Sequence, residues 1–406
     1  MEQTSKASKR NFYSFLWHAG FLAFATNFMD VDTIIPAMLV EAGGSAIHVG
    51  LLTAIMLGGS SFTQLLFAPF LNNRKYKKGF LLLGINSRVI SLLSLGALLY
   101  YLSAHQSASI LWFIFIFITI FSLGGAFANI SYIDILGKTI NQKSRKKFFS
   151  SKQILSGTVV LFSAMLARKV LKIEDFPINY AYMFFIGGLA LLISSAGFWN
   201  LHEDIPSGQK IKGMRNFFGI MKQELVSNKK LVYFLGFINT QGIAVTLLPF
   251  VILYAKQLFK TGAADTGMFL LFKIIGVVLV SIMVLISAKI TRYKYLLYLN
   301  VGLSLLLAIL TISISDAVSL RYIFVIGGIV YSLYSISMNG VMLEISGHSN
   351  RALYAGFSGA GNIMPMLFPL LGGFIIEQFG FQSFFVLYMI IVSMALFFIF
   401  KIDCKK

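Results

Sequence analysis

The sequence predicts an all-α membrane protein whose twelve transmembrane helices form two pseudo-symmetric six-helix bundles. Of the 406 residues, 57% are hydrophobic and only 12% are charged, far from the balance of a soluble domain. Apolar stretches long enough to cross a bilayer recur along the whole chain, and landmarks of the first half recur in the second. The twelve stretches are residues 12–40, 46–71, 79–103, 108–136, 149–172, 178–200, 230–258, 263–289, 294–315, 319–346, 353–378 and 381–401.

Basic residues are distributed unevenly between the two sides that these helices would separate. With the N-terminus inside, most of the 34 Lys and Arg fall in the inner connections and at the two ends of the chain. This bias is typical of inner loops, so we expect a multi-pass protein of the cell membrane with both termini cytoplasmic. The net charge of +19 therefore indicates topology and not nucleic-acid binding. Richness in Phe, Ile and Lys favours a bacterial inner membrane.

Several functional classes are disfavoured by missing motifs. The first apolar run is too long for a signal peptide and lacks a small-residue cleavage site, so we expect it to remain as a helix. Cys404 is the single cysteine, and the five histidines show no metal-ligand spacing, which predicts no disulfide within the chain and no metal site. No Walker sequence occurs, so ATP is not expected to drive the protein, and no cofactor is expected.

The first helix carries two acids, Asp30 and Asp32. A charge at mid-membrane costs about 2.5–3.5 kcal/mol on insertion scales, so such residues normally face a partner or a watery cavity. In a continuous helix Asn27 and Asp30 share a face, whereas Asp32 lies roughly 160° from Asp30. We therefore expect Asp30 to face a central cavity and Asp32 to be held by a neighbouring helix. The alternative is that both acids are structural and locked in ion pairs.

The second and third helices contain a packing motif and a buried cation. Gly58–Ser61 forms a cluster of small residues that permits close approach of another helix. Residues 72–79 form a short basic inner turn that includes Arg74. Arg88, near the middle of the third helix, needs a counter-charge, for which Asp30 or Asp32 is the expected partner. Direct contact with a substrate is the alternative.

Landmarks of the two halves recur in the same order at a nearly constant spacing of about 210–218 residues. The fourth helix ends with Asn129 and Asp134 before a basic connection, and the tenth ends with Asn339 and Glu344 before Arg351. We expect two parallel halves, residues 1–200 and 230–406, joined by a polar cytoplasmic linker, 201–229, that lies on the inner membrane surface. The further matched pairs are Pro36 with Pro249, Gly50 with Gly267, and Arg74 with Arg292.

Polar residues also lie within the helices of the second half. Asn239 and Gln241 fall near the middle of the seventh helix, and Lys273 near the middle of the eighth. Lys273 can neutralise a carboxylate across the cavity or hold an anionic group of a substrate. Alternatively, it is the buried partner of an acid from the other half.

The tenth and eleventh helices offer aromatic and amide side chains. Tyr331 and Tyr334 share one face of the tenth helix, which either meets a substrate or packs against a neighbouring helix. The eleventh carries Asn362 and Pro365 among several glycines. Its proline and glycines predict a kinked helix that bends during gating.

Several of these features together resemble the major facilitator superfamily over nearly the whole chain. The first helix has Pro36 six residues after Asp30, the sixth ends in Leu201-His202-Glu203, and residues 368–385 resemble the family's passage from helix eleven to twelve. The basic turn at 72–79 matches a family signature but lacks its aspartate, where Asn72 or Asn73 stands. The resemblance implies that helices one, four, seven and ten line a central cavity.

The resemblance implies a secondary active transporter and not an enzyme, acting as a monomer by alternating access. An ion gradient would drive it, with Asp30 and Asp32 as the proton-coupling candidates. Ionised Asp30 would attract Lys273 or Arg88, and protonated Asp30 would free them. We expect proton-coupled export of a drug-like or amphipathic compound, although the family's antiporter signature does not follow Ser156. The alternative is proton- or sodium-coupled symport of a small polar or anionic solute, and a transporter-like sensor is a remote alternative.

Two sets of site residues follow from these features and the resemblance. The predicted substrate-cavity residues are Asn27, Arg88, Asn129, Asn239, Gln241, Lys273, Tyr331, Tyr334, Asn339 and Asn362. The predicted gating residues, at the inner ends of the helices, are Arg74, Asp134, Arg145, Arg292, Glu344 and Arg351.

Overall fold

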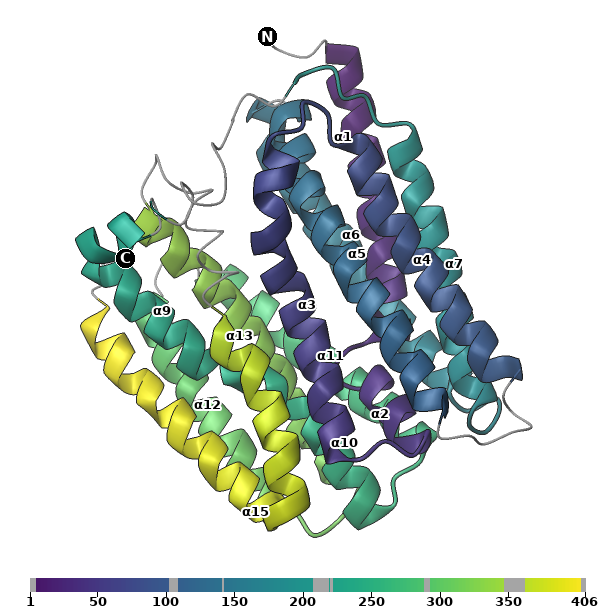
Figure 1. The fold of residues 1–406 in the computed structure, drawn as a ribbon, viewed down its shortest axis with the longest axis vertical. Coiled ribbons are helices and arrows are strands. Elements are labelled where there is room, and N and C mark those ends of the chain that lie inside the picture. The colour runs from purple at the N-terminus through teal and green to yellow at the C-terminus, as the bar shows by residue number, and fades with distance from the viewer. Residues whose placement is uncertain are drawn as a thin grey trace. The chain divides into compact units, whose positions relative to one another are not determined.

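The computed structural model describes residues 5–101, 109–140, 142–206, 219, 222–287, 293–346 and 362–402, and within them it contains helices and no strands (Figure 1). In this part of the chain, ten helical segments are long and apolar enough to cross a membrane. The apolar segment 46–59 is the first part of a longer helix, Ala46–Asn72, and the last segment combines two helices that meet at Gly380. The predicted all-α membrane fold is confirmed.

The chain divides into two compact units. Unit 1 comprises Met1–Asp30 and Phe62–Phe217, and unit 2 comprises Val31–Ser61 and Phe218–Lys406. The segment 31–61 thus belongs to the same unit as the C-terminal helices, although it lies within the predicted domain 1–200. Most of the predicted linker and the start of the predicted span 353–378 lie outside the described residues.

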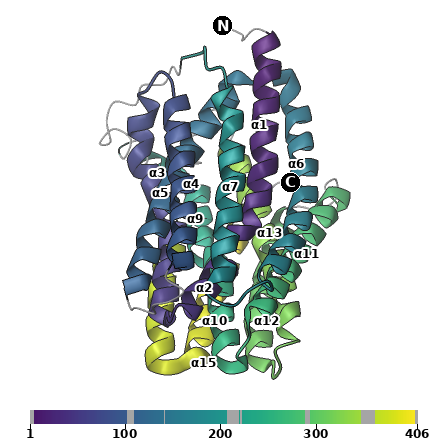
Figure 2. The same cartoon turned by 90° about the vertical axis from the view of Figure 1, so that its right-hand side faces the viewer.

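Among its described residues, unit 1 contains five complete long helices, in which α1 packs against α6 and α7, and α4 packs against α5 and α7 (Figure 2). Gly84 and Gly124 permit the contact between α4 and α5, because a Cβ at Gly84 would lie 2.6 Å from the carbonyl oxygen of Gly124. The five helices are α1 (Ser5–Thr26), α4 (Lys78–Tyr101), α5 (Ser109–Thr139), α6 (Gln142–Val170) and α7 (Ile178–Trp199).

The first membrane span is broken where its two acids lie. After α1, the short 3-10 helix η1 (Asn27–Met29) is followed by Asp30 in an extended conformation and a turn at 31–33, before α2 (Ile34–Glu41) begins. The prediction of one continuous helix over 12–40 was wrong here, so the angle between Asp30 and Asp32 cannot be taken from helical geometry. Short polar side chains compete for backbone hydrogen bonds. Pro36, which has no N–H to donate, lies in the first turn of the new helix, where no such donor is needed.

The seventh span is broken at the matching position. There α9 (Lys229–Gln241) is followed by the 3-10 helix η3 (Gly242–Thr246) and then by α10 (Leu247–Phe259). Leu247 minus Ile34 is 213 residues, the same spacing that separates Pro249 from Pro36. In both spans the helix restarts two residues before the proline, so the sequence repeat is present in the backbone as well.

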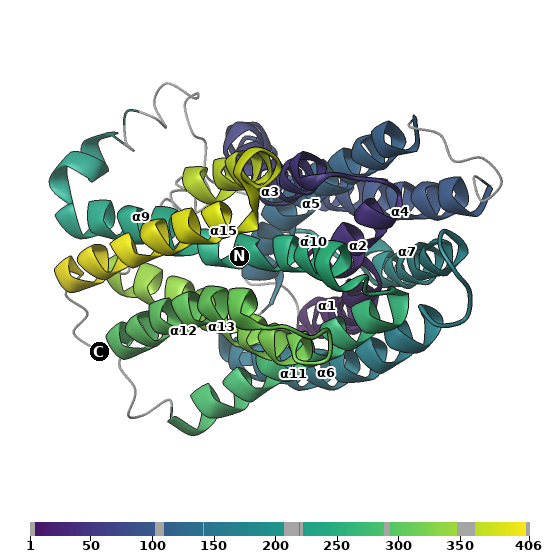
Figure 3. The same cartoon turned by 90° about the horizontal axis from the view of Figure 1, so that it is seen from below.

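Unit 2 combines α2 and the beginning of α3 (Ala46–Asn72) with helices from the C-terminal half. In it α9 packs on α15 (Figure 3), α11 on α13, and α12 on both α13 and α15. The start of α3 lies close to α15, since a Cβ at Gly50 would overlap the carbonyl oxygen of Pro369. The remaining helices are α11 (Ala263–Ser287), α12 (Tyr293–Ser313), α13 (Leu320–Ser346) and α15 (Ile363–Lys401).

The contact between α11 and α13 depends on two glycines. A Cβ at Gly276 would overlap the carbonyl oxygen of Val325, and a Cβ at Gly328 would overlap that of Lys273. Small residues of this kind let membrane helices approach at backbone distance. They hold α13 directly against the part of α11 that carries Lys273.

We predict that Gly328→Val destabilises the protein by about 1–3 kcal/mol, because the added methyl groups overpack the contact between α11 and α13. The measurement is the apparent melting temperature of purified protein in detergent, which we expect to fall by several degrees. Gly302→Val on α12 is the control, because a Cβ there meets no atom within 4 Å. Equal melting temperatures for the two variants would contradict the proposed contact.

Candidate functional site

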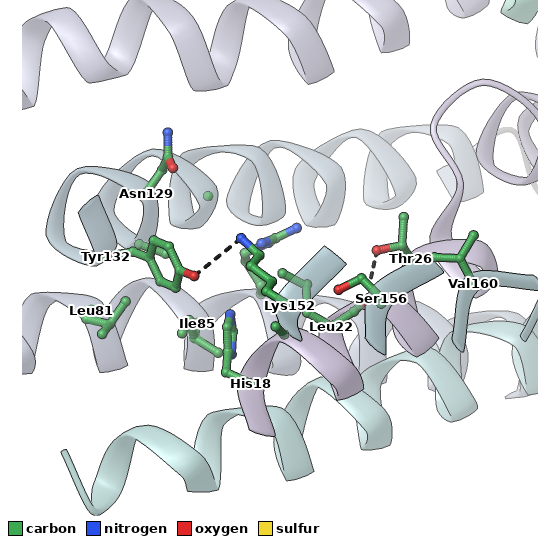
Figure 4. A pocket seen from close by; sticks show the side chains of 15 residues that line it. His18, Leu22, Thr26, Leu81, Ile85, Asn129, Tyr132, Lys152, Ser156 and Val160 are labelled. Atoms are coloured by element: carbon green, nitrogen blue, oxygen red, sulfur yellow. Dashed lines mark hydrogen bonds between the residues drawn. The ribbon is translucent and has the colours of Figure 1, made fainter. Parts of the chain in front are cut away.

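A pocket of about 400 Å³ lies within unit 1 (Figure 4). Its walls come from α1, α4, α5 and α6, and most of the lining residues are small or aliphatic. The polar lining residues are His18, Thr26, Arg88, Asn129, Tyr132, Lys152 and Ser156. Two of the predicted cavity residues, Arg88 and Asn129, are therefore brought together here.

Arg88 reaches the pocket from α4 and is fixed by an aromatic ring and two glycines. Its guanidinium carbon lies 4.2 Å from the centre of the Phe121 ring, an arrangement that favours a cation. A Cβ at Gly124 would lie 3.0 Å from Cγ of Arg88, and one at Gly125 would lie 4.0 Å from Nε. A larger residue at Gly124 would therefore crowd the arginine, whereas the distance at Gly125 is an ordinary contact.

Arg88 has no ion pair with any described residue, and its buried Nε has no hydrogen-bond partner there. The expected pairing of this arginine with Asp30 or Asp32 therefore stays a prediction. Asp32, one of the two expected partners, pairs with Lys273 instead. The charge of Arg88 remains available within the pocket.

Sequence reasoning missed two other residues of the pocket, Lys152 and His18. Nζ of Lys152 lies 3.4 Å from the hydroxyl of Tyr132, and Figure 4 shows the two side chains pointing toward each other. His18 is held by a contact with α7, since Oγ of Ser194 lies 2.6 Å from its Nδ1. The sequence did contain a signal for these two residues, namely a spacing of four that places side chains on one helix face. On α1 this spacing joins His18, Leu22 and Thr26. On α6 it joins Lys152, Ser156 and Val160.

Asn27 was predicted to face the cavity but instead ties the helix break to α6. Its Nδ2 donates to the carbonyl oxygen of Val160 and to Oγ of Ser163, both at 2.7 Å. The side chain is fully buried and does not belong to the described pocket lining. Asn27 thus holds η1 in place.

Asp32 and Lys273 form a buried ion pair within unit 2. Oδ2 of Asp32 lies 2.5 Å from Nζ of Lys273, and their side chains are only 9% and 5% exposed. Nζ of Lys273 also lies 5.7 Å from the centre of the Tyr331 ring. Asp30, two residues before Asp32, is buried at the end of η1.

A second ion pair holds the other end of α2. Nζ of Lys256 on α10 lies 2.5 Å from Oε1 of Glu41, and Oε1 of Glu377 accepts a hydrogen bond from the backbone N–H of Ile47 at 3.1 Å. Sequence reasoning did not select these residues. Together with the pair of Asp32 and Lys273, they attach the segment 31–61 to the C-terminal helices of unit 2.

The other predicted cavity residues of unit 2 fall into separate environments. Gln241 is buried and donates from Nε2 to Oγ of Ser304 at 2.8 Å. Oδ1 of Asn239 accepts from the backbone N–H of Met364 at 2.9 Å. Tyr331 is 45% exposed, and Asn339 is exposed and donates to the carbonyl oxygen of its own helix at Ser335.

Tyr334 and Asn362 converge on the break in the seventh span. A Cβ at Gly242 would lie 2.8 Å from the Tyr334 hydroxyl and 3.2 Å from Oδ1 of Asn362. Both oxygens are buried without a hydrogen-bond partner among the described residues. Glycine at this position therefore leaves room for two polar groups beside η3.

The predicted gating residue Asp134 belongs to a charge cluster at one end of unit 1. Asp134 pairs with Nζ of Lys77 at 2.9 Å and of Lys138 at 3.1 Å, and Lys138 also pairs with Glu203 at 2.8 Å. Glu203 accepts the backbone N–H groups of Lys77 and Lys78 at 2.7–2.9 Å, which places an anion at the N-terminus of α4. Sequence reasoning missed Lys77 and Lys138, and it noted Glu203 only for the resemblance.

The other predicted gating residues do not add to this cluster in the described part of the chain. Arg74 is exposed, and its guanidinium lies 4.6 Å from the centre of the Phe70 ring. The side chains of Arg145 and Glu344 lie outside the described residues, as do Arg292 and Arg351 as a whole.

Comparisons with known proteins identify relatives of the fold. The family model of the Major Facilitator Superfamily matches residues 16–359, whereas no curated protein matches the chain. A crystal structure of a mutant of the nucleoside transporter NupG has a TM-score of 0.70 at 14% identity, covering 96% of this chain and 98% of that one. A transporter of the POT family in complex with a thioalcohol-conjugated peptide gives 0.69 at 12%, covering 98% and 97%. A D-xylose-proton symporter gives 0.66 at 15%, covering 95% and 96%.

We predict that Glu203→Gln lowers the free energy of unfolding by about 2–3 kcal/mol, because it removes the negative charge that strengthens the hydrogen bonds to the start of α4 and pairs with Lys138. Asp204→Asn is the matched control, since Asp204 is exposed. Thermal unfolding of both variants in detergent tests this difference. If Glu203→Gln melts with the wild type, Glu203 does not stabilise the end of α4.

Proposed function

The chain belongs to the major facilitator superfamily and is a membrane transporter and not an enzyme, and on that premise we propose that it carries a small organic solute by proton-coupled alternating access. The observation that carries this proposal is the buried ion pair of Asp32 with Lys273 at the break of the first span. Charged groups within a membrane span are costly and most often serve ion or substrate pathways.

Protonation of Asp32 gives a physical route to coupling. A buried ion pair is stable only while both charges are present, because removal of one leaves the other unneutralised in a poorly solvated site. A proton on Asp32 would therefore remove the negative charge that faces Lys273, whose Nζ also lies 5.7 Å from the centre of the Tyr331 ring. Asp30 is the second candidate for the proton, since it is buried two residues away.

Contacts within unit 2 support a rocking motion of the two sequence halves. The segment 31–61 belongs to the N-terminal half of the sequence, yet ion pairs from Asp32 and Glu41 attach it to α11 and α10. We propose that these contacts form in one state of the cycle and break in the other. In that case the predicted domains 1–200 and 230–406 move as bodies, with 201–229 as the linker between them.

Loss of the pair between Asp32 and Lys273 would alter the balance between the two states. The same ion pair would then respond to the proton and stabilise one conformation. Proton binding and the change between the two conformations would thereby be coupled. The distribution of basic residues supports a location in a cell membrane with both termini cytoplasmic. A monomer is sufficient for this mechanism.

Two cargo classes remain from the sequence, namely a drug-like or amphipathic compound that is exported and a small polar or anionic solute that is carried with an ion. Phe-rich helices support the first class, and the cationic pocket in unit 1 supports the second. We propose the second class, because Arg88 and Lys152 line the pocket and no acid does so among its described residues.

We predict that Asp32→Asn abolishes solute-driven proton movement, because the variant cannot exchange a proton at this position. Proteoliposomes with an internal pH dye are screened against pools of sugars, nucleosides, organic anions and lipophilic dyes, with proton and sodium gradients imposed separately. Asp316→Asn is the control, since Asp316 is exposed. Counterflow of the active solute should persist in Asp32→Asn.

Each outcome of this screen has a defined meaning. Proton movement in the wild type that is lost in Asp32→Asn supports the proposal. Loss in Asp30→Asn alone would transfer the coupling role to Asp30. Solute flux that only a sodium gradient drives would exclude proton coupling, and absence of flux with every pool would overturn the proposed transport function.

A further inference from the structure

Resting on the proposed transport function, we propose that the pocket of unit 1 binds the negatively charged group of its cargo, so that the transported solute is an organic anion with a compact apolar body. The proposal concerns the pocket between α1, α4, α5 and α6. It rests on the charge of the lining residues, the way in which Arg88 is held, and the character of the remaining walls.

The charge of the pocket is the first argument. Arg88 and Lys152 both line it, and no lining residue in the described part of the chain is acidic. Neither cation forms an ion pair with a described residue. Cations in a membrane span require a partner, and two that lie unneutralised in one pocket repel each other. A bound anion would remove both costs.

The way in which Arg88 is held is the second argument. The ring of Phe121 supports its guanidinium, and the glycines at 124 and 125 leave space for it. A fixed guanidinium presents parallel N–H donors that match the two oxygens of a carboxylate or the oxygens of a phosphate. Nε of Arg88 is buried without a hydrogen-bond partner among the described residues, so these residues do not use all the donors of the arginine.

Lys152 complements Arg88 as a more mobile point charge. Its Nζ lies 3.4 Å from the Tyr132 hydroxyl and 5.4 Å from the centre of the Tyr132 ring. Both cations line the same pocket, together with His18. A single anionic group can therefore contact Arg88 and still be attracted by Lys152.

The remaining walls define the rest of the ligand. Leu22, Ile85, Ala128 and Val160 are among the apolar lining residues, and the volume of about 400 Å³ suits a small organic molecule. Hydroxyls of Thr26 and Ser156 lie at the end of the pocket away from Tyr132 (Figure 4). An apolar body with an anionic end matches this lining, whereas a cationic compound would be repelled.

The test compares ligands that share one body and differ in charge. Purified full-length protein in nanodiscs is titrated with benzoate, phenyl phosphate, benzyl alcohol and benzylamine at constant ionic strength, and the shift in melting temperature gives the affinity. We expect at least one of the two anions to stabilise the wild type, and the alcohol and the amine to have no effect. The comparison of the two anions distinguishes a carboxylate site from a phosphate site.

Variants locate the effect. Arg88→Met and Lys152→Met should each weaken binding of the active anion at least tenfold, while Arg88→Lys should weaken it less than Arg88→Met. Lys147→Met is the control, because Lys147 is exposed on the same helix as Lys152. Without ligand, Arg88→Met should melt no lower than the wild type, because it removes an unneutralised cation. A merely structural arginine would give a lower melting temperature.

The results that overturn the inference differ from those that overturn the transport function. The anion site is wrong if neither anion stabilises the wild type, if benzylamine or benzyl alcohol stabilises it equally, or if the pocket variants respond like Lys147→Met. Flux of neutral or cationic solutes in proteoliposomes would then leave transport intact. Only the absence of flux with every solute pool would remove the transport function itself.

Discussion

The cost of placing charge inside a membrane governs how unit 2 is built. Oδ2 of Asp32 and Nζ of Lys273 neutralise each other at a distance of 2.5 Å. Two features of the backbone accompany this ion pair. The first span leaves its helical path at 27–33, and the glycines at 276 and 328 bring α13 against α11. Without the pair, each charge would be buried in a poorly solvated site. The break and the close helix contact are therefore parts of one electrostatic arrangement.

The charged residues of unit 1 occur in two different arrangements. At one end, Asp134 and Glu203 neutralise Lys77 and Lys138, and the backbone N–H groups at the start of α4 share one of these carboxylates. In the pocket, by contrast, Arg88 has no ion pair with a described residue. The first arrangement stabilises a helix end, and the second leaves positive charge for a ligand. The difference lies in the supply of acids, because the chain has 15 acids for 34 basic residues.

Those parts of the fold that depend on long patterns were predictable, and those that depend on local geometry were not. Long apolar runs and the recurring Pro36 and Pro249 indicated the helices and the repeat. The break before each proline was missed, because the apolar residues on its two sides together give one stretch of span length. The polar residues at 27–33 were interpreted as side chains on a continuous helix. Lys152 lies at the start of the predicted span 149–172 and was not selected, since sequence alone does not show where α6 enters the membrane. The charge cluster around Glu203 depends on the segment after α7, which reaches the beginning of α4. The periodicity of the sequence does not indicate such a contact.

The two breaks show how a repeated backbone acquires different roles. After the break, the helix begins again at Ile34 in the first span and at Leu247 in the seventh, 213 residues apart. In each span a proline follows two residues later. In the first span the opening is occupied by acids, and Asp32 meets Lys273 there. In the seventh it is occupied by Gly242, which leaves space for the buried oxygens of Tyr334 and Asn362. Charge at one break suits a response to protons, whereas uncharged donors and acceptors at the other suit hydrogen bonding without a charge penalty. The division follows from the side chains, because the helices restart at matching positions in the two halves.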